Sequence, residues 1–308
     1  MAGNILHKIT NSKLISAILK ISRRITIPGF EGIPLYDVLG FFFKGLQQGS
    51  LTTRASSLAF NFFLAVFPAI IFLFTLIPYV PIDNFQITLF ELLRQVMPKS
   101  AFEAAEGTIV DIIKNQHGSL LSIGFISALY FSTNGFNAMI DGFNNTYHQI
   151  ETRSALRQRL IALILVLITT ILIIVAITLI IYSEFILSKI PLGHISYYSI
   201  VIGRYIILFT LFFSIISFIY FLGPSKKTKW KFISAGSTFS TILALLTSFG
   251  FAYYVNNFGT YNKLYGSIGT LIIVLLWIYF NSIVLLLGFE LNASIHSAKK
   301  NTITHPSN

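Results

Sequence analysis

The chain has 308 residues, of which 54% are hydrophobic and 11% are charged, and its net charge is +11. Charged residues make up about a quarter of a soluble globular domain, so this composition excludes an ordinary soluble protein. It indicates an all-α, polytopic membrane bundle. The absence of cysteine excludes disulfide bonds, thiolate metal sites and cysteine nucleophiles.

Residues 1–54 are predicted to form a cytoplasmic or interfacial arm without a cleaved signal peptide. Apolar and basic residues alternate here at helical spacing, which is typical of an amphipathic helix on an anionic membrane surface. A soluble helix packed on a partner is the alternative. A second apolar segment, which begins at Phe41, is too short to span the membrane and is expected to lie in the interface. The apolar positions of the first helix are Leu14, Ile18, Ile21 and Ile25, and its basic positions are Lys13, Lys20, Arg23 and Arg24.

Six apolar segments follow the arm, and as helices they are long enough to cross a hydrocarbon core of about 30 Å. Together they form a predicted membrane domain over residues 55–295, which leaves residues 296–308 as a cytoplasmic tail. The long loop between the first two spans has two amphipathic patterns, which predict two short helices on the outer face. The predicted spans are approximately residues 55–80, 119–140, 160–182, 200–222, 233–254 and 267–290.

Lysine and arginine are distributed unequally between the two sides of these spans. The N-terminal arm, the loops after the second and fourth spans, and the tail contain sixteen of them, whereas the other side contains six. By the positive-inside rule, both termini are predicted to be cytoplasmic. Basic cytoplasmic loops contact anionic lipid, so the net charge requires no nucleic acid as a partner.

Polar side chains gather on one face of the first span and one face of the second. Polar residues on one side of a membrane helix are expected to face the bundle interior or a wet cavity rather than lipid. We therefore predict that these faces meet in a polar, substrate-binding cavity. The residues are Asn61 in the first span, and Asn134, Asn137 and Asp141 in the second.

The last span extends this cavity. It carries no charged side chain over residues 268–289, and Glu290 follows directly. Because a carboxylate that faces lipid is costly, Glu290 is expected to face protein or water, together with Asn281. Glu151 and Arg153, just beyond the second span, are candidate gate residues at the cytoplasmic entrance, or they pair with each other.

Two sequence signals concern the helix backbones. Pro68 removes a backbone hydrogen bond in the middle of the first span, which predicts a kink. In the fifth span, small residues recur at an unbroken spacing of four, and such stripes allow close approach of a neighbouring membrane helix. The predicted packing residues are Gly236, Ser240, Ala244, Ser248 and Ala252.

Motifs for enzyme chemistry are missing from the sequence. None of the six histidines has a second histidine at three- or four-residue spacing to hold a metal, and there is no GxxxxGK[ST] loop and no GxSxG elbow. We expect no catalytic residue, no metal and no cofactor.

Three stretches resemble the YihY/BrkB family of bacterial inner-membrane proteins. They are LAFNFFLAVFPAIIFLF, GFNNTYHQIETRS and YNKLYGSIGTLIIVLLWIYFNSIVLLLGFELNAS, and the resemblance covers about residues 40–295. Ser154 differs from the proline that often follows the arginine in such proteins. The resemblance implies a multi-pass protein of the bacterial cytoplasmic membrane. Its members have been labelled ribonuclease BN, virulence or serum-resistance factors, and transporters. The most specific positions are Tyr265, Gly266, Trp277, Gly288, Glu290, Leu291 and Asn292.

Two functions from different classes stay open. The first is a secondary translocator of a lipid or small solute, and the second is a non-transporting envelope scaffold whose polar residues fasten helices. A wet cavity from Asn134 towards Glu290 favours the translocator, and a dry bundle favours the scaffold. Membrane lipids are the expected partners, a homo-oligomer is left open, and ribonuclease activity is not expected.

Overall fold

The computed structural model describes residues 25–27, 29–48, 50–76, 78, 107, 110–111, 115, 117–146, 149–150, 153–189, 194–225, 231–258 and 267–304. Within them, the secondary structure is helical apart from one short antiparallel ribbon of β1 (Asn145–Thr146) and β2 (Gln149–Ile150). The predicted helix of the arm before Ile25, and most of the loop with the two predicted outer helices, lie outside the described residues. The helices are α3 (Leu35–Gln48), α4 (Leu51–Leu76), α7 (Gly118–Asn144), α8 (Ala155–Lys189), α9 (His194–Leu222), α10 (Ala235–Phe258) and α12 (Ser267–Thr304).

Five of the helices are long and apolar enough to cross a membrane: α4, α8, α9, α10 and α12. The chain is therefore a helical membrane bundle. α7 coincides with the second predicted span and has 27 residues, but its serine, threonine and asparagine side chains leave it more polar than these five. α4 continues as one helix through Pro68, so the proline does not end the first span.

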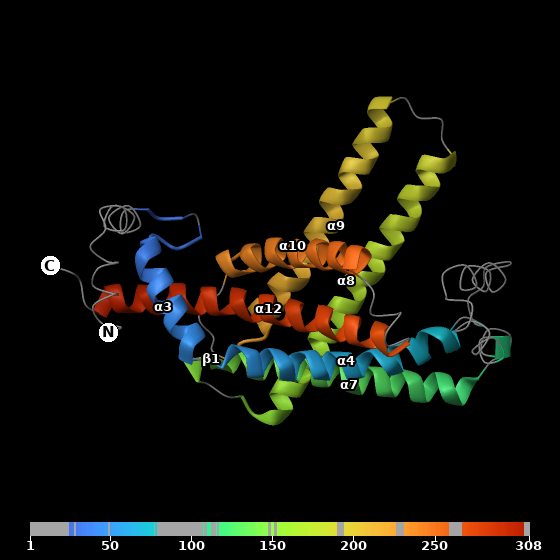
Figure 1. Ribbon diagram of the computed structural model, residues 1–308, viewed down its shortest axis with the longest axis horizontal. Helices are drawn as coiled ribbons and strands as arrows, with labels where there is room; N and C mark the ends of the chain where they lie inside the picture. The colour runs from blue at the N-terminus through green and yellow to red at the C-terminus, as the bar shows by residue number, and fades with distance from the viewer. Residues whose placement is uncertain are drawn as a thin grey trace.

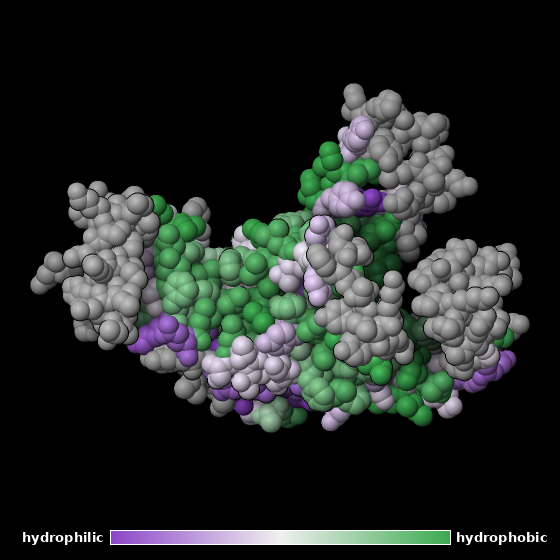
Figure 2. All heavy atoms as spheres, in the orientation of Figure 1, coloured by the Kyte–Doolittle hydropathy of each residue, from purple (hydrophilic) through white to green (hydrophobic). Residues whose placement is uncertain are grey.

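The helices form antiparallel pairs (Figure 1). α4 runs beside α7, α10 runs beside α12, and these four helices lie alongside one another. The α8–α9 hairpin crosses them at an angle and extends beyond them, and α3 crosses the C-terminal part of α12. Hydrophobic side chains cover most of the visible face over α10 and α12, whereas hydrophilic ones gather along the edge near α4, α7 and β1 (Figure 2).

An aromatic cluster fills the centre of the bundle. The rings of Phe143 on α7 and Phe289 on α12 stack with centroids 4.3 Å apart, and Tyr220 of α9 packs edge-on against Phe143. The buried Tyr220 hydroxyl donates to the Leu285 carbonyl at 2.6 Å and lies 2.6 Å from Ser240 Oγ of α10. Four helices thus meet around three rings, and the only polar group of these rings is hydrogen-bonded.

α10 and α12 approach closely at their small residues. A Cβ atom on Gly236 would lie 2.1 Å from the Gly288 carbonyl oxygen, and a Cβ atom on Gly288 would lie 1.8 Å from Ser240 Oγ. Ser240 Oγ also donates to the Val284 carbonyl of α12 at 3.1 Å. Since lipid gives apolar helices no hydrophobic reason to associate, this backbone proximity and hydrogen bonding hold the pair together.

The rest of the predicted small-residue stripe follows the same side of α10. Ala244 is buried, and Ser248 Oγ accepts a hydrogen bond from the Trp277 indole of α12 at 3.2 Å. Ala252, one turn further, is exposed. Four of the five predicted positions therefore lie in the contact between α10 and α12.

The N-terminus of α10 is capped from its own chain and from α12. Ser234 and Ser237 exchange hydrogen bonds between side-chain oxygen and backbone N–H, which satisfies N–H groups that have no partner inside the helix. Asn292 accepts from the Gly236 N–H at 2.8 Å and donates to Ser234 Oγ at 2.9 Å. Asn292 thus fixes where α10 begins against α12.

A second apolar cluster joins α3 to the C-terminal part of α12 through Phe30, Val38 and Ile295. Beside it, Glu31 contacts Lys299 at 2.5 Å and Lys231 at 3.5 Å. The hydrogen bond from Lys299 lowers the pKa of Glu31 below its usual value. α12 continues through this region to its end at residue 304, so no helix end marks the predicted border at residue 295.

Replacing Gly288 by alanine is expected to destabilise the protein, because the new Cβ atom would overlap Ser240 and force α10 away from α12. Overpacking of this kind typically costs about 1–3 kcal/mol. Thermal unfolding in detergent measures the effect. Gly250→Ala, also in a helix but with open space around the new Cβ atom, is the matched control. Equal melting temperatures for the two variants would contradict the close packing of α10 on α12.

Candidate functional site

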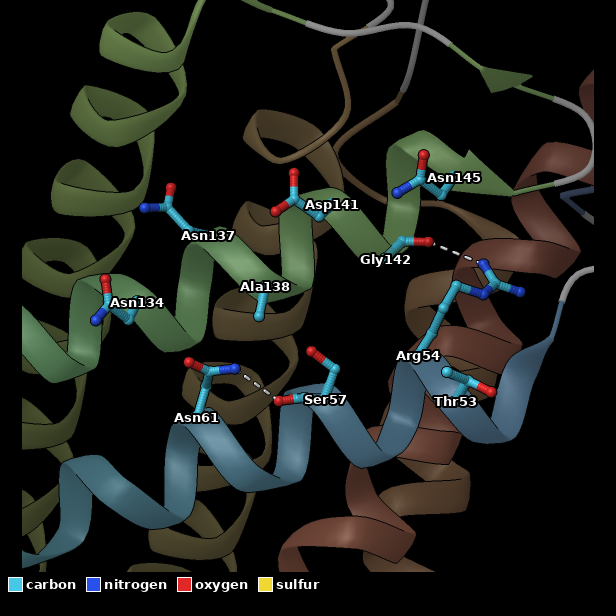
Figure 3. Close-up of a pocket in the computed structure, with 10 residues that line it drawn as sticks. All are labelled: Thr53, Arg54, Ser57, Asn61, Asn134, Asn137, Ala138, Asp141, Gly142 and Asn145. Carbon is cyan, nitrogen blue, oxygen red and sulfur yellow. Dashed lines mark hydrogen bonds between the residues drawn. The ribbon is translucent and has the colours of Figure 1, made fainter.

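A polar groove of about 380 Å³ lies between the N-terminal part of α4 and the C-terminal part of α7 (Figure 3). We call it the α4–α7 groove. Most of its lining groups are hydroxyls and amides, with one carboxylate and one guanidinium. The lining residues are Thr53, Arg54, Ser57, Asn61, Asn134, Asn137, Ala138, Asp141, Gly142 and Asn145.

The groove lies on the outer side of the α4–α7 pair. The inner sides of the two helices pack on each other, with Gly135 against the Phe62 ring and with Leu58 and Met139 fully buried. Asp141 is exposed, and Asn137 is partly exposed; both extend from α7 away from α4 (Figure 3). This polar face of α7 borders the groove, and the first turns of α8 lie against it. The inner face is taken by apolar residues that pack more closely.

The first turns of α8 contact the groove residues of α7. Arg159 donates to Asn134 Oδ1 at 2.5 Å, and its guanidinium lies 5.0 Å from the centre of the Tyr130 ring. Gln158 donates to Asp141 Oδ1 at 2.7 Å. These contacts hold the amide of Asn134 and the carboxylate of Asp141 in fixed orientations.

Arg54 connects the groove to the core. Its Nη1 donates to the Gly142 carbonyl at 2.8 Å, near the end of α7, and its Nη2 lies 3.8 Å from Glu290 Oε2 of α12. The side chain of Arg54 is 10% exposed and that of Glu290 is completely buried. The guanidinium therefore places a positive charge next to a buried carboxylate.

The groove contains four of the six residues predicted for the substrate cavity: Asn61, Asn134, Asn137 and Asp141. Glu290 lies behind Arg54 and does not line the groove. Asn281 does not line it either, since its side chain donates to the Trp277 carbonyl one turn earlier in the same helix. The predicted cavity was to run from Asn134 to Glu290; Glu290 is completely buried, and the residue before it, Phe289, belongs to the aromatic cluster.

Arg153, a predicted gate residue, binds the end of α9. Its guanidinium donates to the carbonyls of Leu222 and Gly223 at 3.2 Å each, and also to that of Pro224. Burial lowers the pKa of Arg153 below its ordinary value. Positive charge at a helix C-terminus is favourable, so this contact fastens α8 to α9. Glu151 lies outside the described residues.

Sequence reasoning missed Arg54, which lines the groove, and Arg159, which bonds to the lining residue Asn134. Both stand at the ends of apolar segments, where a basic side chain is the ordinary signal of membrane topology. A signal was nevertheless present in Arg54, because helical spacing places it on the same side as Ser57 and Asn61, one and two turns later. Among the described residues, no group of three or more histidine, aspartate and glutamate side chains could hold a metal.

Comparison with known proteins gives one family and several relatives. The family model described as Virulence factor BrkB matches residues 42–308. The chain is 32% identical to the ribonuclease-like protein YfkH of Bacillus subtilis, over 83% of this chain and 93% of YfkH. It is 26% identical to a UPF0761 membrane protein of Haemophilus influenzae, over 82% of this chain and 93% of that protein. No solved structure matches.

Arg54 and Glu290 are expected to depend on each other for stability. Removing one partner of a buried ion pair leaves an uncompensated charge, which typically costs about 3–5 kcal/mol, whereas replacing both by apolar residues is often neutral. Arg54→Met and Glu290→Leu should therefore each lower the melting temperature in detergent more than the double variant does. Additive losses in the double variant would show that the two side chains act independently.

Proposed function

This chain belongs to the BrkB virulence factor family, and we propose that it translocates a lipid or a small solute across the cytoplasmic membrane. We assign the α4–α7 groove as the site that receives the substrate headgroup. One observation carries this proposal: the groove is open to the surface and most of its lining residues are polar, in a protein that exposes many large hydrophobic side chains elsewhere.

Polar side chains that face hydrocarbon need water, protein or a lipid headgroup as partners. The groove extends from Asn134 to the end of α7 at Asn144 and includes Asn145 of β1. At 1.5 Å per residue the helical part is about 15 Å long, or half of the hydrocarbon core. A lipid can place its headgroup there while its acyl chains stay in the bilayer. This geometry suits a lipid better than a soluble solute, which needs an enclosed path.

In this proposal α7 is a sixth span, paired along its length with α4. Six spans put both termini on one side, and the unequal distribution of basic residues favours the cytoplasm for that side. The groove then lies in the cytoplasmic half of the membrane, where α4 begins and α7 ends. α3 would lie in the interface, with its exposed Leu39 and Phe43 towards lipid.

The scaffold remains the second candidate, because the centre of the bundle is densely packed around Phe143, Phe289 and Tyr220. A scaffold would use the groove for a constant structural lipid. We propose no nuclease activity for this chain. The ribonuclease-like name belongs to the relative YfkH, and among the described residues no group of histidine, aspartate and glutamate side chains could hold a metal for phosphodiester hydrolysis.

The proposed topology can be tested with single cysteines, since the chain has none of its own. An impermeant maleimide on intact cells should label a cysteine at Gln116 and leave one at Lys227 unlabelled until the cells are opened. The physical reason is that the basic loops stay in the cytoplasm. The opposite labelling pattern would show that the orientation is inverted.

Translocation can be tested in reconstituted vesicles with fluorescent phospholipids and a membrane-impermeant quencher. Asn134→Leu removes the acceptor of the Arg159 hydrogen bond, and hydrogen bonds to charged groups contribute about 1.5–3 kcal/mol. We expect lipid movement to slow by about tenfold or more, since 1.4 kcal/mol corresponds to tenfold in rate.

Thr210→Leu is the matched control for this assay, because Thr210 is exposed on α9 and its hydroxyl donates to the Ile206 carbonyl of its own helix. It should leave the rate unchanged. Wild-type vesicles that move none of the lipids tested would reject translocation in favour of the scaffold. Equal rates in wild type and Asn134→Leu would reject the groove as the site.

A further inference from the structure

We infer that the α4–α7 groove selects a headgroup that carries an ammonium beside a phosphate ester, as in phosphatidylethanolamine, and that Asp141 binds the ammonium. This inference rests on the groove assigned in the proposed function, and it names the substrate class. It follows from the charges around the groove and from the partners that each charge already has.

Two ionisable residues line the groove, Arg54 and Asp141. Arg54 is turned inward: its Nη1 is bonded to the Gly142 carbonyl and its Nη2 lies against Glu290, with both Nε and Nη2 fully buried. Its positive charge is therefore offset by a carboxylate inside the bundle and is not presented to a ligand.

Asp141 is in the opposite situation. It is exposed, and Gln158 donates to one carboxylate oxygen only, Oδ1. Among the described residues, no side chain donates to Oδ2, so one carboxylate oxygen is left for a ligand. Gln158 is neutral and leaves the negative charge of Asp141 in place. The open end of the groove thus presents a fixed carboxylate to a ligand.

The phosphate of the same headgroup would lie near Asn134, two turns before Asp141 on α7. Asn134 is held by Arg159, whose guanidinium supplies positive charge beside the groove. Hydroxyls of Thr53 and Ser57 and the amide of Asn137 add neutral donors along the opposite wall and between the two charges. A negative charge at Asp141 and a positive charge at Arg159 complement a zwitterion. They do not favour a headgroup whose only charge is negative.

The size of the preference follows from the exposure of the site. Ion pairs at exposed sites are weak, and an ammonium on Asp141 should favour a zwitterionic amine headgroup by about three- to fivefold over phosphatidylglycerol with the same acyl chains. Phosphatidylcholine, which has a bulkier quaternary ammonium without N–H donors, should rank between them. Amides and hydroxyls alone would give no such order.

The test is native mass spectrometry of the full-length protein in detergent, with equal amounts of phosphatidylethanolamine, phosphatidylcholine and phosphatidylglycerol. Wild type should retain phosphatidylethanolamine about three- to fivefold over phosphatidylglycerol. Asp141→Asn should bring the ratio close to one, and Asp141→Glu should restore the preference. Asp37→Asn, an exposed carboxylate on α3 outside the groove, is the matched control and should keep the wild-type ratio.

Further arms separate the remaining outcomes. Soluble glycerophosphoethanolamine should compete with the lipid only weakly, and strong competition would show that a free amine ester is the ligand. Equal retention of all lipids by wild type, or an unchanged ratio in Asp141→Asn, would overturn the inference. The inference would also be overturned if the wild type were a dimer without any lipid preference and Asp141→Asn were a monomer. A second copy of the chain would then be what occupies the groove in the wild type.

The binding assay and the vesicle assay fail independently. Selective binding of phosphatidylethanolamine without lipid movement would leave the inference standing and reject translocation. Movement of lipids without headgroup selection at Asp141 would support translocation and reject the inference about the headgroup.

Discussion

The burial of Glu290 is the constraint on which the rest of the structure depends. A carboxylate inside a membrane bundle requires a compensating cation, and Arg54 provides it from the first turn of α4 while donating to the last turn of α7. The start of α4, the end of α7 and the middle of α12 are thus fixed relative to one another at one place. Because desolvation offsets most of the attraction in such a pair, we interpret its role as specifying helix position rather than adding stability.

Three residues of α12, at every second position, set the places of its neighbours: Gly288, Glu290 and Asn292. Gly288 and Asn292 are four residues apart and share one face, where Gly288 admits the backbone of α10 and Asn292 caps its N-terminus. Glu290 lies between them in sequence and points about 200° around the helix, towards α4. The Gly-x-Glu-Leu-Asn ending in the family signature therefore combines a close approach, an ion pair and a helix cap. Each one sets the position of a neighbouring helix.

The sequence predicted the helical membrane architecture because uncharged runs of about twenty residues have few other uses. It also indicated which residues share a face, and four of the six cavity residues do line one groove. Periodicity does not say which neighbour a face meets, however, and the side of α7 that packs inward was decided by Gly135, which lets Phe62 approach. Asn281 does not line this groove, and its side chain bonds to a carbonyl of the preceding turn, a partner that periodicity does not reveal.

The ion pair of Arg54 with Glu290 explains why the charge that the groove lining offers to a ligand is the negative one of Asp141. Arg54 is the one basic residue in the groove lining, and its guanidinium points towards the buried carboxylate of Glu290. The outside keeps Asp141, amides and hydroxyls. A path through the centre of the bundle would have to separate the stacked rings of Phe143 and Phe289 and expose Glu290. A headgroup in the outer groove needs neither change, so the dense core and a role in lipid movement are compatible.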